Sequence, residues 1–231
     1  MNVTTGLTAP HPMQEGCDHF IPGLRSQPWW NDCEFPFVSE LEANWELIAG
    51  ELFDLMLSGS LRLHPQCFGG PRTQIADGDW NIFELWSFGL LNERNAIEAP
   101  RTVKLLASIP ELRGHPRGLI YFSILNPHVH VSPHCGPTNS RIRIHLGLKV
   151  PEGATIRVGT ETRSWKEGKC LIFDDSWEHE AHNPSDSYRA VLLMDAWHPD
   201  ITQNQREKLL RNRKPADQLK CRRREGWSRY S

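Results

Sequence analysis

The chain has 231 residues, of which 39% are hydrophobic and 23% charged. This composition predicts one folded domain with a good core and excludes a disordered chain. The formal net charge of −2 gives no overall field that would attract nucleic acid or a membrane. No apolar run approaches the ~20 residues that a membrane-spanning helix needs, and we expect no signal peptide, because the first residues lack its basic and apolar regions. The six cysteines never form a C-x-x-C pair, which favours reduced thiols and a cytoplasmic protein.

The first part of the chain is expected to be irregular and then helical. Residues 1–38 are rich in proline, glycine and tryptophan and predict an irregular arm lying on the core. A helix should follow, with Ser39 as its N-cap and Glu42 in the capping-box position. Apolar residues recur at helical spacing up to Gly59; they are Leu41, Trp45, Ile48, Leu52 and Leu55. Residues 39–78 are therefore expected to form a helical annex whose apolar stripe faces the core.

From about residue 79 the chain consists of short strand-like runs separated by turn residues. The candidate strands lie at 79–89, 118–125, 140–150, 154–159, 169–175 and 188–197, with a short helix around 99–110. Because no helices alternate with these strands, an antiparallel sandwich or barrel is favoured over a parallel sheet.

The chain ends in a basic segment. Residues 206–229 hold ten Lys or Arg and three Asp or Glu, which leaves a formal charge of −9 on residues 1–205. The simplest interpretation of residues 206–231 is a solvated helix followed by a tail. The alternative is that residues 220–229 dock to an acidic partner or to nucleic acid.

Histidines and arginines concentrate in HVHVSPHCGPTNSRIRIHLGL, residues 128–148, which predicts a turn followed by a strand. Arg141, Arg143 and His145 alternate with apolar residues along this strand, so they share one face. That face either meets solvent or lines a cavity. Two arginines and a histidine in a cavity would suit a small anion with more than one carboxylate.

Downstream, His179 follows a short strand and Arg189 opens the next. Together with the first stretch, this pattern resembles the Fe(II)/2-oxoglutarate oxygenases and, within them, the aspartyl/asparaginyl β-hydroxylase family. PHCGPTNSRIRIHLGL, KCLIFDDSWEHEAHN and MDAWHPDIT carry the resemblance, which covers roughly residues 78–205. It implies a mainly β fold with a double-stranded β-helix (a cupin-like jelly roll) over residues 79–205. With the flanking N-terminal helices, residues 39–205 would form one oxygenase domain.

By the same resemblance, His134 and His179 are the Fe(II) ligands. In most of the wider superfamily, a carboxylate two residues after the first histidine completes the metal-binding face. Gly136 occupies that position here, as it does in the β-hydroxylase family. The resemblance gives no metal role to the remaining nearby histidines, which are His128, His130 and His182.

The implied co-substrates are 2-oxoglutarate and O2. Arg189 would pair with the distal carboxylate of 2-oxoglutarate in a bidentate geometry, and Ser123 would donate its hydroxyl to the same carboxylate. Arg143 and His145 would hold the end that chelates the iron. No acid–base residue is implied, because the iron carries out the difficult chemistry.

The residues expected to bind the substrate depart in part from the family pattern. Arg141 and Asp175 match substrate-binding positions, whereas Ile82 and Tyr121 replace an amide and a lysine. Trp29, Trp30 and Trp80 are expected to pack rather than to line a substrate cleft. The oligomeric state stays open.

These features predict a dioxygenase that hydroxylates an unactivated carbon, above all a β-carbon. The substrate would be an amino acid, a short peptide or a related carboxylate-bearing small molecule. We expect neither nucleic acid nor a membrane as a partner. The alternatives are an oxygenase of the same family that causes desaturation or ring closure, and a cupin-like metal-binding module without turnover.

Overall fold

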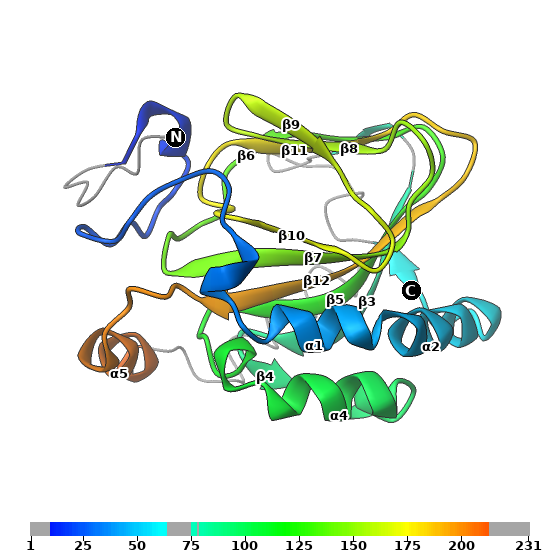
Figure 1. Ribbon diagram of the computed structural model, residues 1–231, viewed down its shortest axis with the longest axis horizontal. Helices are drawn as coiled ribbons and strands as arrows, with labels where there is room; N and C mark the ends of the chain where they lie inside the picture. The colour runs from blue at the N-terminus through cyan, green and yellow to red at the C-terminus, as the bar shows by residue number, and fades with distance from the viewer. Residues whose placement is uncertain (1–9, 64–74, 78, 213–231) are drawn as a thin grey trace, which may run out of the picture.

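A computed structural model describes residues 10–63, 75–77 and 79–212. Two antiparallel β-sheets face each other (Figure 1). The first sheet has the strand order β1-β3-β5-β12-β7-β10, with β4 paired to β3, and the second has the order β2-β6-β11-β8-β9.

The strands are short, as the turn residues between the apolar runs predict. The first sheet consists of β1 (Arg62–Leu63), β3 (Trp80–Ser87), β4 (Leu90–Leu91), β5 (Leu119–Leu125), β7 (Arg141–Lys149), β10 (Cys170–Phe173) and β12 (Arg189–Trp197). The second consists of β2 (Ile75–Asp77), β6 (Val129–His134), β8 (Thr155–Val158), β9 (Glu161–Ser164) and β11 (His179–Asn183). From β5 onwards the chain passes back and forth between the two sheets. This confirms the predicted double-stranded β-helix.

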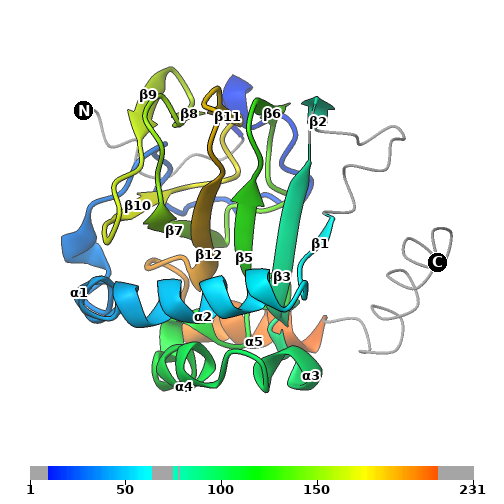
Figure 2. The ribbon, with the colours of Figure 1, turned by 90° about the vertical axis from the view of Figure 1, so that its right-hand side faces the viewer.

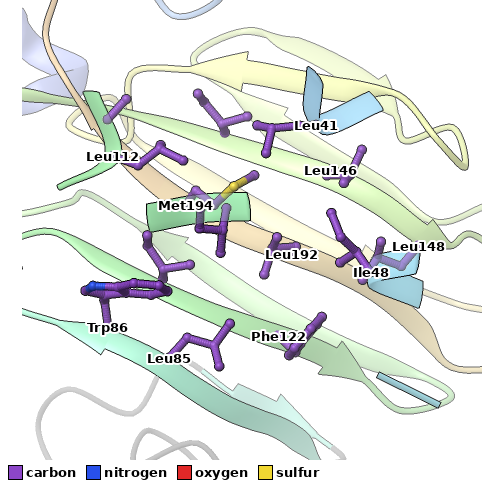
Figure 3. Close-up of a cluster of buried hydrophobic side chains, with 14 of the residues drawn as sticks. Leu41, Ile48, Leu85, Trp86, Leu112, Phe122, Leu146, Leu148, Leu192 and Met194 are labelled. Atoms are coloured by element: carbon purple, nitrogen blue, oxygen red, sulfur yellow. The ribbon is translucent and has the colours of Figure 1, made fainter. Parts of the chain in front are cut away.

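Helices cover the outer face of the first sheet (Figures 1 and 2). They are α1 (Val38–Ala43), α2 (Trp45–Leu57), α3 (Glu93–Ala96) and α4 (Pro100–Ser108), with the 3-10 turn η4 (Pro110–Leu112). Helix α5 (Gln203–Arg211) follows β12 at one end of the sheet, and the 3-10 turns η1 (Pro12–Gln14) and η2 (Asp32–Glu34) belong to the N-terminal arm. Leu41 of α1 and Ile48 of α2 are fully buried in the same apolar cluster as Leu146, Leu192 and Met194 of the sheet (Figure 3). Burying a side chain of this size contributes about 2 kcal/mol, so this layer accounts for much of the folding free energy.

Strand β7 alternates as its sequence predicts. Its isoleucines and leucines pack toward the helices, whereas Arg141, Arg143 and His145 belong to the opposite face, between the two sheets. These three residues are 3%, 8% and 6% exposed. The polar face of the strand therefore lines the interior of the β-helix and does not meet solvent.

The helix expected from Ser39 is divided into α1 and α2, and the prediction of its cap is wrong. Phe37 already has a helical conformation, so Ser39 lies inside α1 and donates its hydroxyl to the carbonyl of Pro36 (3.0 Å). Glu42 accepts hydrogen bonds from the backbone N–H of Cys170 (2.9 Å) and from Nζ of Lys169 (2.7 Å). Glu42 thus serves the start of β10 instead of a capping box.

The ends of the chain are only partly described. Residues 10–37 of the arm are irregular apart from η1 and η2. The helical annex ends at Leu57, where β1 soon follows, and residues 64–74 and 78 lie outside the described residues. The basic segment forms α5 as far as Arg211, and the predicted tail and docking segment (213–231) lie outside the described residues. Four of the six cysteines are described, and all four are free thiols.

Candidate metal and 2-oxoglutarate site

His134 ends β6 and His179 begins the neighbouring strand β11, where the two residues lie directly opposite each other. Their ring centroids are 4.1 Å apart. Both segments were predicted as turns. They are strands because Val129 and Val131 alternate with outward-facing residues on β6, a pattern that Pro133 and the histidines hide in the sequence. The structure brings together the two predicted ligands.

Each of the two predicted ligand rings is fixed by a hydrogen bond from Nδ1 to a nearby carbonyl. Nδ1 of His134 donates to Ser132 and Nδ1 of His179 donates to Trp177, both at 2.8 Å. Because a carbonyl only accepts, the proton resides on Nδ1 and the lone pair on Nε2. Burial lowers the pKa of His134, and burial together with His134 lowers the pKa of His179 well below its usual value. Two neutral imidazoles with free Nε2 atoms suit a metal ion.

Gly136, the position of the missing carboxylate, lies against Asp175. Its backbone N–H donates to the carbonyl of Asp175 at 2.6 Å, and a Cβ at residue 136 would overlap the Asp175 carboxylate. The position therefore has no room for a ligand side chain. Within the described residues, no group of three or more His, Cys, Asp or Glu side chains could hold a metal ion.

Four buried charges form a network behind the ligands. Arg141 contacts Asp175 at 2.7 Å and Asp195 at 2.8 Å, and Arg143 contacts the same two carboxylates at 3.0 and 2.9 Å. Arg141 also donates to the carbonyl of Arg117. Burial opposes ionisation of Asp175, but the two arginines hold its pKa well below its usual range. Arg141 and Asp175, predicted to bind substrate, are thus brought together as partners of each other.

Arg189 lies at the other end of the site. Its Nη1 donates to the carbonyl of Ser123 at 3.1 Å and lies 3.4 Å from the Ser123 hydroxyl. Its guanidinium stacks over the ring of Trp165 at 4.6 Å. Arg189 is 2% exposed, its Nε has no hydrogen-bond partner, and no carboxylate among the described residues pairs with it. Burial lowers its pKa to about 9, so this cation lacks the anion that would compensate its lost hydration.

His145 is a second buried donor without a partner. Its Nδ1 accepts a hydrogen bond from the indole N–H of Trp165 at 3.3 Å. An indole N–H only donates, so the proton of the neutral ring resides on Nε2. This Nε2 is buried and has no partner. Since nearly all buried donors in proteins are paired, Nε2 of His145 and the guanidinium of Arg189 together fit a ligand with two separated acceptor groups, which 2-oxoglutarate is.

Two tryptophans support this part of the site. The indole N–H of Trp80 donates to the Ser123 hydroxyl at 3.0 Å, which leaves the hydroxyl proton of Ser123 free to reach a ligand. Trp165 contacts both His145 and Arg189. Trp165 was not predicted to belong to the site, and nothing in its local sequence distinguishes it from the other eight tryptophans.

The remaining histidines of the two strands do not join the ligands. His128 contacts Asp186 at 3.0 Å, and His130 contacts Glu180 at 2.8 Å and stacks edge-on with His182 at 5.3 Å. His130, Glu180 and His182 belong to the opposite face of the second sheet from the ligands.

Comparison with known proteins gives the family. A family model described as Aspartyl/Asparaginyl beta-hydroxylase matches residues 42–199, so the similarity begins earlier than residue 78 and includes α2. The chain is 44% identical over 193 residues to human Aspartyl/asparaginyl beta-hydroxylase, which covers 82% of this chain and 25% of that protein. It is 38% identical over 195 residues to human Aspartate beta-hydroxylase domain-containing protein 2, covering 82% of this chain and 52% of that protein.

A bacterial relative has a different name. The chain is 37% identical over 176 residues to the Ornithine lipid ester-linked acyl 2-hydroxylase of Rhizobium tropici, covering 74% of this chain and 61% of that protein. The chain thus spans between a quarter and about three fifths of the length of these relatives. Within the described residues, no helix has the length and apolarity needed to cross a membrane. The family match and the two opposed histidines agree: this chain belongs to the aspartyl/asparaginyl β-hydroxylase family.

Proposed function

We propose that this protein is an Fe(II)- and 2-oxoglutarate-dependent dioxygenase that hydroxylates an unactivated carbon. The observation that carries the proposal is the buried guanidinium of Arg189, which has no carboxylate partner among the described residues. A dicarboxylate bound there would supply the missing charge. A metal-binding module without turnover would have no use for such a site.

The chain's own residues would act by binding and orientation. His134 and His179 would hold Fe(II) through Nε2, because their Nδ1 atoms are occupied. Arg189 and Ser123 would bind the distal carboxylate of 2-oxoglutarate, and Nε2 of His145 would donate to the end near the metal. Once bound, iron, 2-oxoglutarate and O2 supply the oxidising power for C–H hydroxylation.

Two further residues would act around this core. Arg143 is already paired with Asp175 and Asp195, so it would contribute its positive charge beside His145 while keeping these partners. Phe173 contacts the rings of both His145 and His179, with centroids 5.0 and 5.7 Å apart. Its apolar ring would exclude water from the space between the two halves of the site.

We propose an amino acid, a short peptide or a related carboxylate-bearing molecule as the substrate, hydroxylated at the β-carbon. The family and its human relatives' names support this. Arg141 and Asp175 would act in substrate binding, which requires part of their ion pair to open. Desaturation or ring closure would use the same residues and would be recognised from the product.

A lipid acyl chain is the second candidate substrate. Ile82 and Tyr121 belong to a buried apolar cluster with Leu193, and Arg141 is occupied by two carboxylates. An apolar wall beside arginines that Asp175 and Asp195 already neutralise suits an alkyl chain better than a free carboxylate. The name of the Rhizobium relative, an acyl 2-hydroxylase, also describes hydroxylation of an acyl chain.

The test begins without oxygen. Fe(II) and then 2-oxoglutarate are added to the purified protein, and the weak visible charge-transfer band of the chelate is recorded. Air is then admitted, and succinate is measured with amino acids, acidic peptides or acyl-ornithine lipids. A band with succinate stimulated by one class supports the proposal and selects the substrate. A folded protein that gives no band contradicts it.

Cytoplasmic location and the absence of nucleic-acid and membrane partners stay predictions.

A further inference from the structure

The N-terminal arm lies at the end of the two sheets where β6 ends and β11 begins (Figure 1). Its short turn η1 (Pro12–Gln14) precedes the region that the family model matches. The turn is closed by a capping box, in which His11 accepts from the backbone of Met13 and donates its own N–H to the Gln14 side chain. The arm thus brings a locally rigid turn to the ends of the ligand-bearing strands.

One carbonyl of this turn contacts both ligand-bearing segments. The carbonyl of Met13 accepts the backbone N–H of Glu178 at 2.6 Å and the thiol of Cys135 at 3.6 Å. Cys135 directly follows His134, and Glu178 directly precedes His179. The approach is close, because a Cβ on Gly16 would lie only 2.8 Å from Cβ of Cys135.

The Gln14 side chain continues this connection toward the second ligand. It is fully buried, its Nε2 donates to the Ser176 hydroxyl at 2.7 Å, and its Oε1 accepts from the Ser26 hydroxyl at 3.1 Å. The Ser26 hydroxyl accepts the indole N–H of Trp177 at 3.1 Å. The carbonyl of Trp177 in turn accepts Nδ1 of His179. Hydrogen bonds from the arm therefore hold the side chain of Trp177, the residue whose carbonyl fixes the ring of a proposed iron ligand.

We propose that η1 is a clamp that sets the metal geometry, with Gln14 as its positioning residue. Gln14 does not touch the metal. It holds the Ser176 hydroxyl and, through Ser26, the Trp177 indole, and so orients the His179 ring. The Met13 carbonyl binds the main chain at Glu178 and keeps that segment in register with the residue after His134. Partners behind a metal ligand typically change metal affinity about 10- to 100-fold when they are removed. This inference rests on the proposed function, because it assumes that His134 and His179 bind the metal.

The test measures metal binding without turnover. Co2+ is titrated into the purified full-length protein, and its visible spectrum reports both affinity and coordination geometry. Gln14→Met keeps the length of the side chain but removes its three hydrogen bonds, with His11, Ser26 and Ser176, so we expect Co2+ affinity to fall about tenfold and the band intensities to change. Hydrogen exchange of the amides at 176–179 should also become faster.

The matched control is Arg25→Met in the same arm. Arg25 contacts Asp200 at 2.8 Å and Glu34 at 2.6 Å, and its side chain has no bond to residues 174–178 among the described contacts. This variant should lower the melting temperature while Co2+ affinity and spectrum stay within about twofold of wild type, since no partner behind a ligand is lost.

The outcomes separate the two proposals. Gln14→Met with wild-type affinity and spectrum would overturn the clamp and leave the proposed function intact. Wild-type protein that is folded but binds no Co2+ would overturn both. If Gln14→Met does not fold, Ser26→Ala replaces it: a smaller loss of affinity with the same spectral change supports the clamp, and an unchanged titration overturns it.

Discussion

The Asp175 carboxylate fills the space that a side chain at Gly136 would need. The usual third ligand and this carboxylate exclude each other, so the glycine is a packing requirement in this chain as well as a gap in the metal-binding face. Asp175 in turn is held by Arg141 and Arg143. The two-histidine site and the buried charge network therefore depend on each other.

Restoring the carboxylate at residue 136 should fail. Gly136→Asp would force a second carboxylate against Asp175, and overpacking with like charge should destabilise the protein by about 3 kcal/mol. The double variant Gly136→Asp with Asp175→Gly should recover part of this loss, because the new carboxylate can then face the arginines. Chemical denaturation of the wild type, the two single variants and the double variant completes a double-mutant cycle. Additive losses would contradict the overlap.

Replacing the arginine of the proposed 2-oxoglutarate site should separate metal binding from co-substrate binding. Arg189→Met replaces a buried cation with an apolar side chain of similar volume, so we expect the unliganded protein to be at least as stable as wild type. The concentration of 2-oxoglutarate for half-maximal turnover should rise about 100-fold, with Co2+ affinity unchanged. Arg157→Met, an ion-pair partner of Glu178 and Glu180, is the control. If 2-oxoglutarate protects Arg189→Met against thermal unfolding as strongly as it protects the wild type, the distal carboxylate must bind elsewhere.

The tautomer of His145 should depend on a single indole. Trp165→Phe keeps an aromatic ring beneath Arg189 but removes the N–H donated to Nδ1 of His145, so Nε2 no longer has to carry the proton. We expect about tenfold weaker binding of 2-oxoglutarate, measured by titration of the charge-transfer band. Trp29→Phe is the control, because the indole N–H of Trp29 has no partner in the described structure. Equal effects of the two variants would show that only packing is involved.

Metal affinity should be insensitive to moderate acid. Protons compete for Nε2 only below the pKa of the ring, and burial lowers the pKa of both His134 and His179. The competition thus begins below the usual histidine range near ~6.5. Co2+ affinity should stay nearly constant from about pH 8 to pH 6 and fall only at lower pH. Titrations at three pH values test this, and a steep loss between about pH 7 and 6 would mean that the rings are hydrated.

The sequence predicts those parts of the molecule whose pattern is local. The alternation along β7 and the motifs around His134 and His179 were enough for the fold and for the proposed ligands. The ion pair of Arg141 with Asp175 joins β7 to the turn after β10. The position of Trp165 depends on how the chain passes from β9 in one sheet to β10 in the other. Neither therefore leaves a pattern in the sequence. Ser39 was placed wrongly because the preceding Phe37 is already helical.

The bond between Gln14 and Ser176 joins residues that are 162 positions apart. During synthesis the arm leaves the ribosome before its partners in the β10–β11 connection, which emerge only after most of the domain has been made. Contacts of such long separation form late, because the intervening chain must be ordered before they close. Completion of the candidate metal site around the arm therefore waits until the chain has been made at least as far as β11. A nascent chain would therefore fold its core before it could hold iron in the proposed geometry.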